Sequence, residues 1–367
     1  MKVILTGGGT GGHIYPAIAI AEQIREKQPD AEIMFVGTER GLEKELVPRA
    51  GYPIRFITVT GFDRKKLLKN VKTLLNLQQG LKEAKKIIDE FRPDIVIGTG
   101  GYVCGPVVKV AGEMGIKAFI HEQNAFPGLT NKMLEKHVEK IFTGFEEAGP
   151  RFKNQGKVVF TGNPVRKGFY CSDKHAARAR LGVPDNCFAV LSFGGSQGAG
   201  KMNEVVSEAA AVFSGVEGIA LFFATGRRHY DAVISGFAER GVELGENIRV
   251  LPYLDEMDQL MAASDIVISR AGALAISEIA VCGKPAILVP SPNVVGNHQY
   301  FNARAVSDRG SALLIEEREF SAEKLISALL EMKSDRGVLE AMEAAVGQSA
   351  KCRAVEIIYD NLGIDRQ

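Results

Sequence analysis

Cysteine is sparse and irregularly spaced in this chain of 367 residues. The five cysteines are odd in number and contain no C-x-x-C pair, which argues against a zinc site and a disulfide framework. No apolar run approaches the roughly 20 residues of a membrane span, and the run at residues 3–5 is too short for a signal peptide. A formal net charge of +1 excludes a strong global attraction to nucleic acid. We therefore expect a cytosolic protein that binds no nucleic acid and meets charged partners through local patches.

The overall composition is that of an ordinary globular protein, with 46% hydrophobic and 24% charged residues. Short apolar, β-branched segments alternate with helical patterns, which predicts parallel sheets covered by helices on both faces. The opening strand and glycine loop return in similar form at residues 188–199. We therefore predict two α/β, Rossmann-like domains that face each other across a cleft. The predicted parts are residues 1–164, 165–340 and a helical segment at 341–367, with a linker-like stretch from 161 to about 185.

A glycine-rich loop at residues 7–12 separates the first predicted strand from a predicted helix. Such loops let backbone amides approach a ligand, and the N-terminus of the following helix favours an anion, usually a phosphate. Pro16 suits the first turn of that helix. The loop also fits the G-x-G-x-x-G pattern of dinucleotide binders, with Glu39 near the end of the second strand. A tight turn without a ligand stays open as well, although none of these interpretations requires the imidazole of His13.

Other glycine-rich and polar segments follow other predicted strands. Residues 98–105 form a second glycine loop, and residues 121–124 read His-Glu-Gln-Asn. Because parallel strands place their carboxyl ends at one edge of a sheet, these segments predict a ligand site there. In the second half, the loop at 194–199 has no P-loop lysine. The segment 269–278 leads into a helix in which Glu278 could accept the hydroxyls of a ribose while nearby amides hold phosphates.

The segment 61–86 is strongly basic, with eight lysine and arginine residues, and most of its apolar residues share one helical face. A basic amphipathic helix of this kind can lie on an anionic lipid surface. It can equally pack its leucines on the sheet and leave its lysines in water. The residues alone do not decide between these two interpretations.

The motifs GGGTGGH, GTGGYVCGP, HEQN, TGNPVR, FGGSQGA, SRAGALAISE and NHQ run from residue 7 to about residue 303. Together they resemble the MurG family, the bacterial UDP-N-acetylglucosamine–undecaprenyl-pyrophosphoryl-muramoylpentapeptide N-acetylglucosaminyltransferases. The resemblance implies a two-domain glycosyltransferase fold of the B type. It also implies an inverting transfer of N-acetylglucosamine from UDP-N-acetylglucosamine (UDP-GlcNAc) to the 4-hydroxyl of the muramoyl sugar of lipid I, which makes lipid II for peptidoglycan synthesis.

The same resemblance assigns functional residues. A base with a pKa near neutrality must accept the proton of the acceptor hydroxyl; we predict His13 in that role, with the cluster at 121–124 as the second candidate. No D-x-D pair occurs in the sequence, so we expect fixed donors in place of a bound metal, and no cofactor. The family's donor contacts fall on Thr10, Gly11, Gly12, Asn124, Arg166, Ser196, the backbone of Leu254, Ala273, Leu274, Ala275, Ile276, Ser277, Glu278 and Gln299.

The partners implied are UDP-GlcNAc, lipid I, an anionic membrane surface that the segment 61–86 contacts, and other proteins of cell-wall synthesis and cell division. The location implied is peripheral, on the cytoplasmic side of the cell membrane, with a role in cell shape and the cell cycle. The family also has its C-terminal helix pack on the first domain. Alternatives are a nicotinamide enzyme, a UDP-sugar epimerase, a glycosyltransferase with another lipid acceptor such as diacylglycerol, and a non-enzymatic UDP-sugar sensor. Cofactor absorbance, an acceptor screen and a turnover assay distinguish them.

Overall fold

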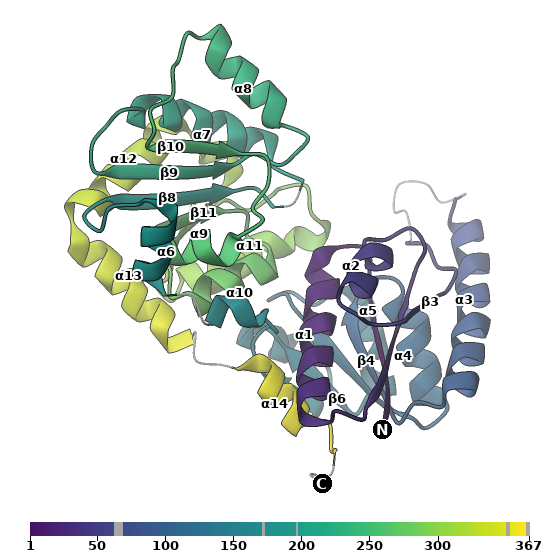
Figure 1. Cartoon of the computed structure of the whole chain (residues 1–367). Helices are drawn as coiled ribbons and strands as arrows, with labels where there is room; N and C mark the ends of the chain where they lie inside the picture. Colours follow the sequence, from purple (N-terminus) through teal and green to yellow (C-terminus); the bar gives the residue numbers. More distant parts are fainter. Residues whose placement is uncertain (62–68, 171–172, 196, 350–352, 365–367) are drawn as a thin grey trace. The chain divides into compact units, whose positions relative to one another are not determined.

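The computed structural model describes residues 1–61, 69–170, 173–195, 197–349 and 353–364, which form two compact units (Figure 1). Unit 1 contains Met1–Arg166 together with Cys352–Gln367, and unit 2 contains Lys167–Lys351. In each unit, helices cover both faces of one parallel sheet (Figure 1). The chain therefore has the two-domain α/β architecture expected of a B-type glycosyltransferase.

The sheet of unit 1 is entirely parallel, and its strand order is β3-β2-β1-β4-β5-β6-β7. The order reverses between β1 and β4, which is where ligands bind in open parallel sheets. The pairing of β1 with β4 shifts register between Thr6 and Gly7, at the start of the first glycine loop. The strands are β1 Lys2–Gly7, β2 Glu32–Gly37, β3 Ile54–Phe56, β4 Ile95–Gly100, β5 Lys117–Glu122, β6 Lys140–Thr143 and β7 Val158–Phe160.

The first helix begins earlier than predicted. Helix α1 starts at Gly11, after an extended N-cap at Thr10, so Pro16 lies inside the helix and not in its first turn. The prediction was wrong because it used proline as the start signal, whereas the last two glycines of the loop already adopt helical backbone. The helices of unit 1 are α1 Gly11–Lys27, α2 Glu43–Arg49, α3 Lys69–Phe91, α4 Cys104–Glu113, α5 Leu129–Leu134 and α14 Ala354–Asp360, with 3-10 turns η1 Glu135–His137, η2 Glu146–Arg151 and η3 Gln155–Lys157.

Two apolar cores cover the two faces of the unit 1 sheet. Helices α3 and α4 contribute to one core, and α1 contributes to the other. The last helix, α14, joins the α1 core through Ile358 and Tyr359, and Leu362 just beyond the helix joins the same core. Burial of each such side chain contributes about 1.5–3 kcal/mol. Gln28 also donates a hydrogen bond of 3.2 Å to the hydroxyl of Tyr359, so the end of the chain is an integral part of unit 1.

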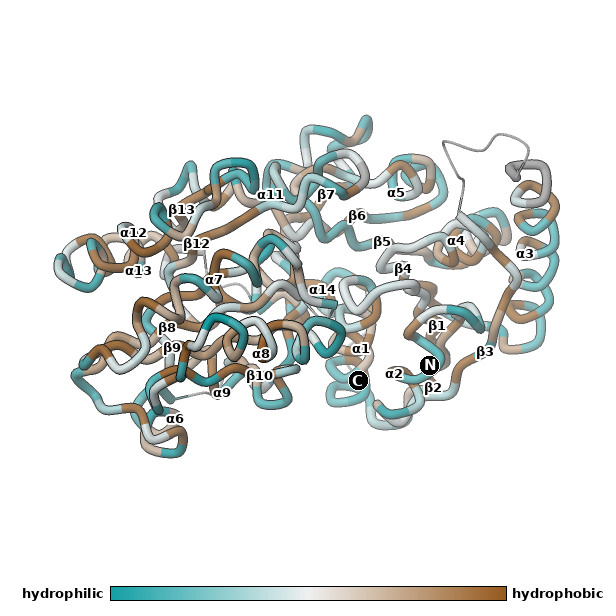
Figure 2. Tube along the Cα trace, turned by 90° about the horizontal axis from the view of Figure 1, so that it is seen from above, coloured by the Kyte–Doolittle hydropathy of each residue, from teal (hydrophilic) through white to brown (hydrophobic). Residues whose placement is uncertain are grey.

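Unit 2 repeats the topology of unit 1 with one strand fewer, in the order β10-β9-β8-β11-β12-β13. Strands β8 and β9 are among its most hydrophobic segments (Figure 2). The strands are β8 Phe188–Phe193, β9 Ile219–Ala224, β10 Ile248–Leu251, β11 Ile266–Ser269, β12 Ala286–Leu288 and β13 Ala312–Leu314. The helices are α6 Lys174–Leu181, α7 Gly200–Phe213, α8 Tyr230–Glu239, α9 Met257–Ala263, α10 Ala273–Val281, α11 His298–Ser307, α12 Ala322–Ser334 and α13 Arg336–Ser349, with η4 Lys167–Tyr170, η5 Val295–Asn297 and η6 Glu317–Glu319.

The stretch predicted as a linker contains helix α6. Its ends carry ordinary helix signals: the carboxylate of Asp173 caps the N-terminus by accepting from the amide of Ala176 at 2.8 Å, and Gly182 ends the helix in the left-handed region. The linker interpretation was wrong because it relied on weak periodicity and overlooked these caps.

The predicted boundary between residues 340 and 341 falls inside helix α13. Leu339 and Met342 lie on opposite sides of that boundary, yet both belong to the core of unit 2. Unit 2 therefore extends through α13, and of the two last helices only α14 belongs to unit 1. The two helices share a similar amphipathic pattern in the sequence, so the pattern could not show that they pack on different sheets.

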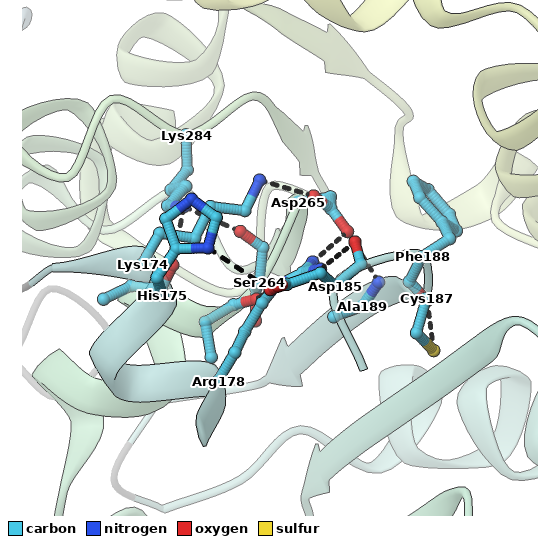
Figure 3. A network of polar contacts seen from close by, with 12 residues as sticks. Lys174, His175, Arg178, Asp185, Cys187, Phe188, Ala189, Ser264, Asp265 and Lys284 are labelled. Atoms are coloured by element: carbon cyan, nitrogen blue, oxygen red, sulfur yellow. Dashed lines mark hydrogen bonds and ion pairs between the residues drawn. The ribbon is translucent and has the colours of Figure 1, made fainter. Parts of the chain in front are cut away.

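A part-buried polar network closes the end of the unit 2 sheet at which β8 and β11 begin (Figure 3). The carboxylate of Asp265 accepts from the ammonium of Lys174, the guanidinium of Arg178 and the amide of Ala189, each at 2.7 Å. Burial raises the pKa of Asp265, but the Lys174 and Ala189 hydrogen bonds and the nearby positive charges outweigh it and hold this pKa below its usual value. Lys284 donates to the carbonyls of residues 262 and 264 in the same network. The network ties α6 and α9 to the sheet and serves stability.

Candidate active site

The predicted functional residues lie at the carboxyl ends of the strands in both units. In unit 1 they occupy the start of α1, the segment after β5 and the segment after β7; in unit 2 they follow β10 or lie in α10 and α11. Ser196 lies outside the described residues. The sites of each unit are therefore built on the edge where the topology predicts ligand binding.

The glycine loop after β1 is organised by a buried carboxylate, Glu43, whose side chain has no exposed surface. One carboxylate oxygen accepts from the amide of Gly9 at 2.9 Å, and the other accepts from the amide and hydroxyl of Thr38 at 2.9 and 2.8 Å. A Cβ added at Gly8 or Gly41 would lie 2.5 or 1.9 Å from the nearest carboxylate oxygen. The part of the loop at Gly8 and Gly9 thus binds the carboxylate of Glu43, an acidic group of the protein itself.

This arrangement argues against the dinucleotide interpretation of the first loop. A pyrophosphate would compete with Glu43 for the Gly9 amide and would be repelled by the carboxylate. Glu39, the acidic residue that the dinucleotide pattern would place on a ribose, is exposed. No local pattern in the sequence distinguishes Glu43 from other glutamates, because its partners Gly9 and Thr38 surround it only in the folded protein.

His13 lies in the first turn of α1, next to the end of β4. Its Nδ1 atom is 3.1 Å from the carbonyl oxygen of Thr99 and 3.2 Å from Oε1 of Gln123. Both atoms are acceptors, so Nδ1 carries a hydrogen, and the lone pair of the neutral ring lies on Nε2. A Cβ at Gly100 would lie 2.5 Å from Nδ1, so glycine is needed there. A neutral imidazole with its lone pair on Nε2 can accept a proton.

The second candidate base, His121, does not suit that role. The side chain is fully buried, and burial lowers its pKa to about 4 in spite of a hydrogen bond to the carbonyl of Gly162. Its two ring nitrogens contact Gly162 and Gln123 at 3.0 Å each. Sequence reasoning named this residue because it follows a strand, but it could not show that the side chain points into the sheet.

Asn124 is held by a second buried carboxylate, Glu122, which is 2% exposed. Glu122 accepts from the backbone amide and the side-chain Nδ2 of Asn124, both at 3.0 Å. It also accepts from the amide of Gly128 and from Nδ2 of Asn131 at 2.9 and 2.8 Å. Four hydrogen bonds therefore satisfy this carboxylate, and the one from Nδ2 fixes which way the amide group of Asn124 points.

Arg166 ends unit 1, two residues beyond the boundary that the sequence predicted. Its guanidinium lies 4.9 Å from the ring centre of Tyr15, a residue of α1. A cation–π contact of this kind orients a guanidinium without using its hydrogen-bond donors. Arg166 is thereby attached to the same helix that carries His13.

In unit 2, the segment 273–278 forms the first part of α10. Gly272 caps the helix without a side-chain hydrogen bond, and the first turn contains no acidic residue. Such an N-terminus presents backbone donors and partial positive charge to an anion. Within the segment, Ala273, Ile276 and Glu278 are buried, whereas Leu274, Ala275 and Ser277 are half-buried.

The loop after β12 is held by Arg270, a residue that the sequence did not single out as a separate contact. Its guanidinium donates to the carbonyls of residues 289–290 at 3.1 and 3.3 Å and forms an ion pair with Glu317. Gln299 accepts from the amide of Ser291 at 2.9 Å through Oε1. Leu254 is half-buried, after β10. The loop beside the predicted donor contacts is thus fixed from two sides.

Helix α3 contains the described part of the basic amphipathic segment. Its second half packs Ala84, Ile87 and Ile88 into the core of unit 1, while Leu74 and Leu75 are 53% and 62% exposed. Hydrophobic and hydrophilic residues alternate along the helix (Figure 2). Residues 62–68 and the side chains at 69–72 lie outside the described part. The packing interpretation is confirmed for the second half of the helix, whereas the first half presents leucines to the surface, and contact with a lipid surface stays a prediction.

Within the described ranges, no group of three or more histidine, cysteine, aspartate or glutamate side chains is placed to hold a metal ion. None of the helices searched there is both long enough and apolar enough to cross a membrane.

Comparison with known proteins places this arrangement in context. Residues 3–143 match the N-terminal domain of glycosyltransferase family 28, and residues 189–358 match its C-terminal domain. The chain is 45% identical over 364 residues to the UDP-N-acetylglucosamine–N-acetylmuramyl-(pentapeptide) pyrophosphoryl-undecaprenol N-acetylglucosamine transferase of Clostridioides difficile strain 630, across 99% of this chain and 88% of that protein.

Solved structures agree with these matches. The crystal structure of MurG from Acinetobacter baumannii is similar with a TM-score of 0.78 and 27% identity, across 98% of this chain and 99% of the other. The UDP-GlcNAc 2-epimerase of Neisseria meningitidis is similar with a TM-score of 0.67 but only 13% identity, across 99% of both chains. The second likeness shows the fold alone.

Proposed function

The chain belongs to the MurG family within glycosyltransferase family 28, and from this membership we infer that it transfers N-acetylglucosamine from UDP-GlcNAc to lipid I. The observation that carries the inference is the 45% identity over nearly the whole chain to a relative named for this reaction. The product is lipid II, with a β-1,4 bond to the muramoyl sugar, and the role is in peptidoglycan synthesis. An epimerase of the same fold is not favoured, because its identity is only 13%.

In the proposed mechanism, Nε2 of His13 accepts the proton from the 4-hydroxyl of the muramoyl sugar. The hydroxyl oxygen attacks the anomeric carbon as the bond to UDP breaks, and the configuration at that carbon inverts. The support for His13 is its hydrogen on Nδ1, 3.1 and 3.2 Å from two acceptors, which leaves the lone pair on Nε2. Thr10, Gly11, Gly12 and Asn124 are the proposed sugar contacts of unit 1.

We assign the donor nucleotide mainly to unit 2. The uncapped N-terminus of α10 can donate to the leaving diphosphate, as can Arg166 and the loop that contains Ser196. The backbone of Leu254 suits a planar base, Glu278 suits the ribose hydroxyls, and Gln299 suits the sugar. Because Gln299 already uses Oε1 on Ser291, its Nε2 group is the part available as a donor.

The proposed location is the cytoplasmic face of the cell membrane, where the undecaprenyl chain of lipid I resides. Support comes from Leu74 and Leu75, which are exposed on a helix rich in lysine. Apolar side chains that insert between headgroups and lysines that meet anionic lipid together give peripheral binding. Other proteins of cell-wall synthesis and division are proposed partners that would meet the enzyme there.

The test is a transfer assay with labelled UDP-GlcNAc and a lipid I analogue. We expect His13→Ala to lower kcat by about 10²-fold or more while UDP binding changes little. The matched control is His175→Ala, since that imidazole is 80% exposed and lies in unit 2, on helix α6, away from the carboxyl ends of the strands (Figure 3). Turnover of the His13 variant near that of the wild type would remove His13 from the mechanism. Activity should also survive a chelator; loss that magnesium restores would contradict metal-independent transfer.

A further inference from the structure

Behind His13 lies a chain of buried polar side chains that the transfer mechanism does not use. His121 and Gln123 are two residues apart and are 0% and 2% exposed. Gln123 contacts Thr99 of β4, and His121 contacts Gln123 and Gly162 through its two ring nitrogens. We propose that Gln123, oriented by His121, is a positioning residue that holds the hydrogen of His13 on Nδ1 and so keeps the lone pair on Nε2. This inference rests on the proposed function, in which Nε2 of His13 is the base.

The orientation of the Gln123 amide follows from its surroundings. Its Nε2 atom lies 2.7 Å from the carbonyl oxygen of Thr99 and 3.2 Å from that of His121. Carbonyl oxygens only accept, so the nitrogen of the amide group must face them. Oε1 must then point the other way, toward Nδ1 of His13 at 3.2 Å. A flipped amide would set its oxygen against two carbonyls.

His121 enforces the same orientation from behind. Its Nε2 is 3.0 Å from the carbonyl oxygen of Gly162, so that nitrogen carries the hydrogen of the neutral ring. The lone pair is then on Nδ1, 3.0 Å from Nε2 of Gln123, where it shares the two amide hydrogens with the carbonyls of Thr99 and His121. Because burial keeps His121 neutral at pH 7, this polarity is constant under physiological conditions.

Each side chain therefore donates to the next in one direction: His13 to Gln123, Gln123 to His121, and His121 to the carbonyl of Gly162. At the end of the chain Oε1 can only accept, so Nδ1 of His13 must donate. The other tautomer would place the hydrogen on Nε2, where the base could not accept a proton, and it would leave Gln123 without a donor. The carbonyl of Thr99 also accepts from Nδ1 of His13, at 3.1 Å, so Gln123 supplies one of the two acceptors of that nitrogen.

The experiment reads the tautomer directly. With histidine labelled by nitrogen-15, the chain gives six pairs of ring signals, and His13→Ala identifies the pair of residue 13. We expect the wild type to carry the hydrogen on Nδ1. Gln123→Met removes the amide at similar volume, so we expect the Nδ1–H population to fall and kcat to drop about tenfold, with KM for UDP-GlcNAc within about twofold.

The control is Thr143→Val, which removes a fully buried hydroxyl on the neighbouring strand β6. That hydroxyl has no hydrogen-bond partner among the described residues, and Thr143 pairs with Glu122 in the sheet. Its His13 signals and its kcat should match the wild type. A His13 tautomer that stays unchanged in Gln123→Met would overturn the proposal. The spectra need no substrate, so a failure of wild-type transfer would refute the proposed function separately.

Discussion

The two sheets reverse their strand order at equivalent places, yet they hold their ligand-facing loops with opposite charges. In unit 1 the buried carboxylates of Glu43 and Glu122 accept from loop amides. In unit 2 the guanidinium of Arg270 donates to loop carbonyls. One unit therefore uses backbone donors for its own structure, whereas the other uses backbone acceptors.

This difference explains how one topology can serve two substrates. The carboxylate at the first glycine loop disfavours a nucleotide diphosphate there, although the loop has the glycine pattern of a nucleotide binder. In unit 2 the first turn of α10 contains no acidic residue, which suits the diphosphate of the proposed donor. Under the proposed function, the nearby charged residue, more than the fold, sets the ligand preference of each edge.

The largest expected effect is on the stability of unit 1, where the carboxylate of Glu43 holds the loop. Glu43→Ala leaves the Gly9 amide and both donors of Thr38 without their partner; an unsatisfied buried donor costs about 1–3 kcal/mol, and these part-buried donors lie toward the lower end of that range. We expect the free energy of unfolding of unit 1 to fall by about 4 kcal/mol, measured by urea denaturation. Glu45→Ala is the control, since that glutamate is on the same helix with its side chain 69% exposed. Equal stability of the two variants would contradict an organising role for Glu43.

The two units should also lose stability in different pH ranges. Burial lowers the pKa of His121 to about 4 in the folded state, below its ordinary value near 6.5. The unfolded chain binds more protons between these values, so stability is complete above about pH 6.5 and falls by about 3 kcal/mol as the pH approaches 4. Urea denaturation of the wild type and of His121→Gln across this pH range measures the free energy of unfolding, and that of the variant should not decline.

The corresponding loss in unit 2 is expected at lower pH. Because the pKa of Asp265 lies below its usual value, the stability it contributes is complete above the unfolded value near 4 and is lost as the pH falls further. Asp265→Asn should remove that loss in unit 2 without changing the response between pH 4 and 6.5. If His121→Gln and Asp265→Asn shifted the same pH range, the two units would not titrate separately.

A smaller effect is expected in unit 2, where the guanidinium of Arg270 holds the loop. Arg270→Met removes the donors to residues 289–290 and the ion pair with Glu317, which should loosen the loop beside Gln299. We expect KM for UDP-GlcNAc to rise about tenfold with little change in kcat. Arg304→Met, whose guanidinium is 60% exposed on α11, provides the control. A fall in kcat at unchanged KM would instead place Arg270 in the chemical step.

The smallest effect concerns membrane contact. Leu74→Ser with Leu75→Ser should weaken binding to anionic vesicles about fivefold, since two apolar side chains no longer insert. Their large exposure means that the free energy of unfolding should change by less than about 0.5 kcal/mol. Val212→Ser on α7 of unit 2, also 55% exposed, is the matched control for vesicle binding. Equal losses for both variants would show that α3 is not a special contact.

The local patterns of the sequence determined the framework of this protein. The alternation of short apolar segments with helical patterns predicted the two parallel sheets, because such alternation is a local signal. The caps of α6 were equally local and were simply overlooked, whereas the division between α13 and α14 depends on which core each helix meets.

The tertiary structure alone decided which residues of the site form hydrogen bonds with one another. Gly9 and Glu43 are 34 residues apart, and His13 and Gln123 are 110 residues apart, so no local pattern could pair them. The sequence by itself determined the glycine loops, the position of His13 and the family to which the motifs belong. Only the folded sheet decided that Glu43 takes a loop amide and that His13 faces two acceptors, because hydrogen-bond partners are set by distances that exist only after the strands have paired.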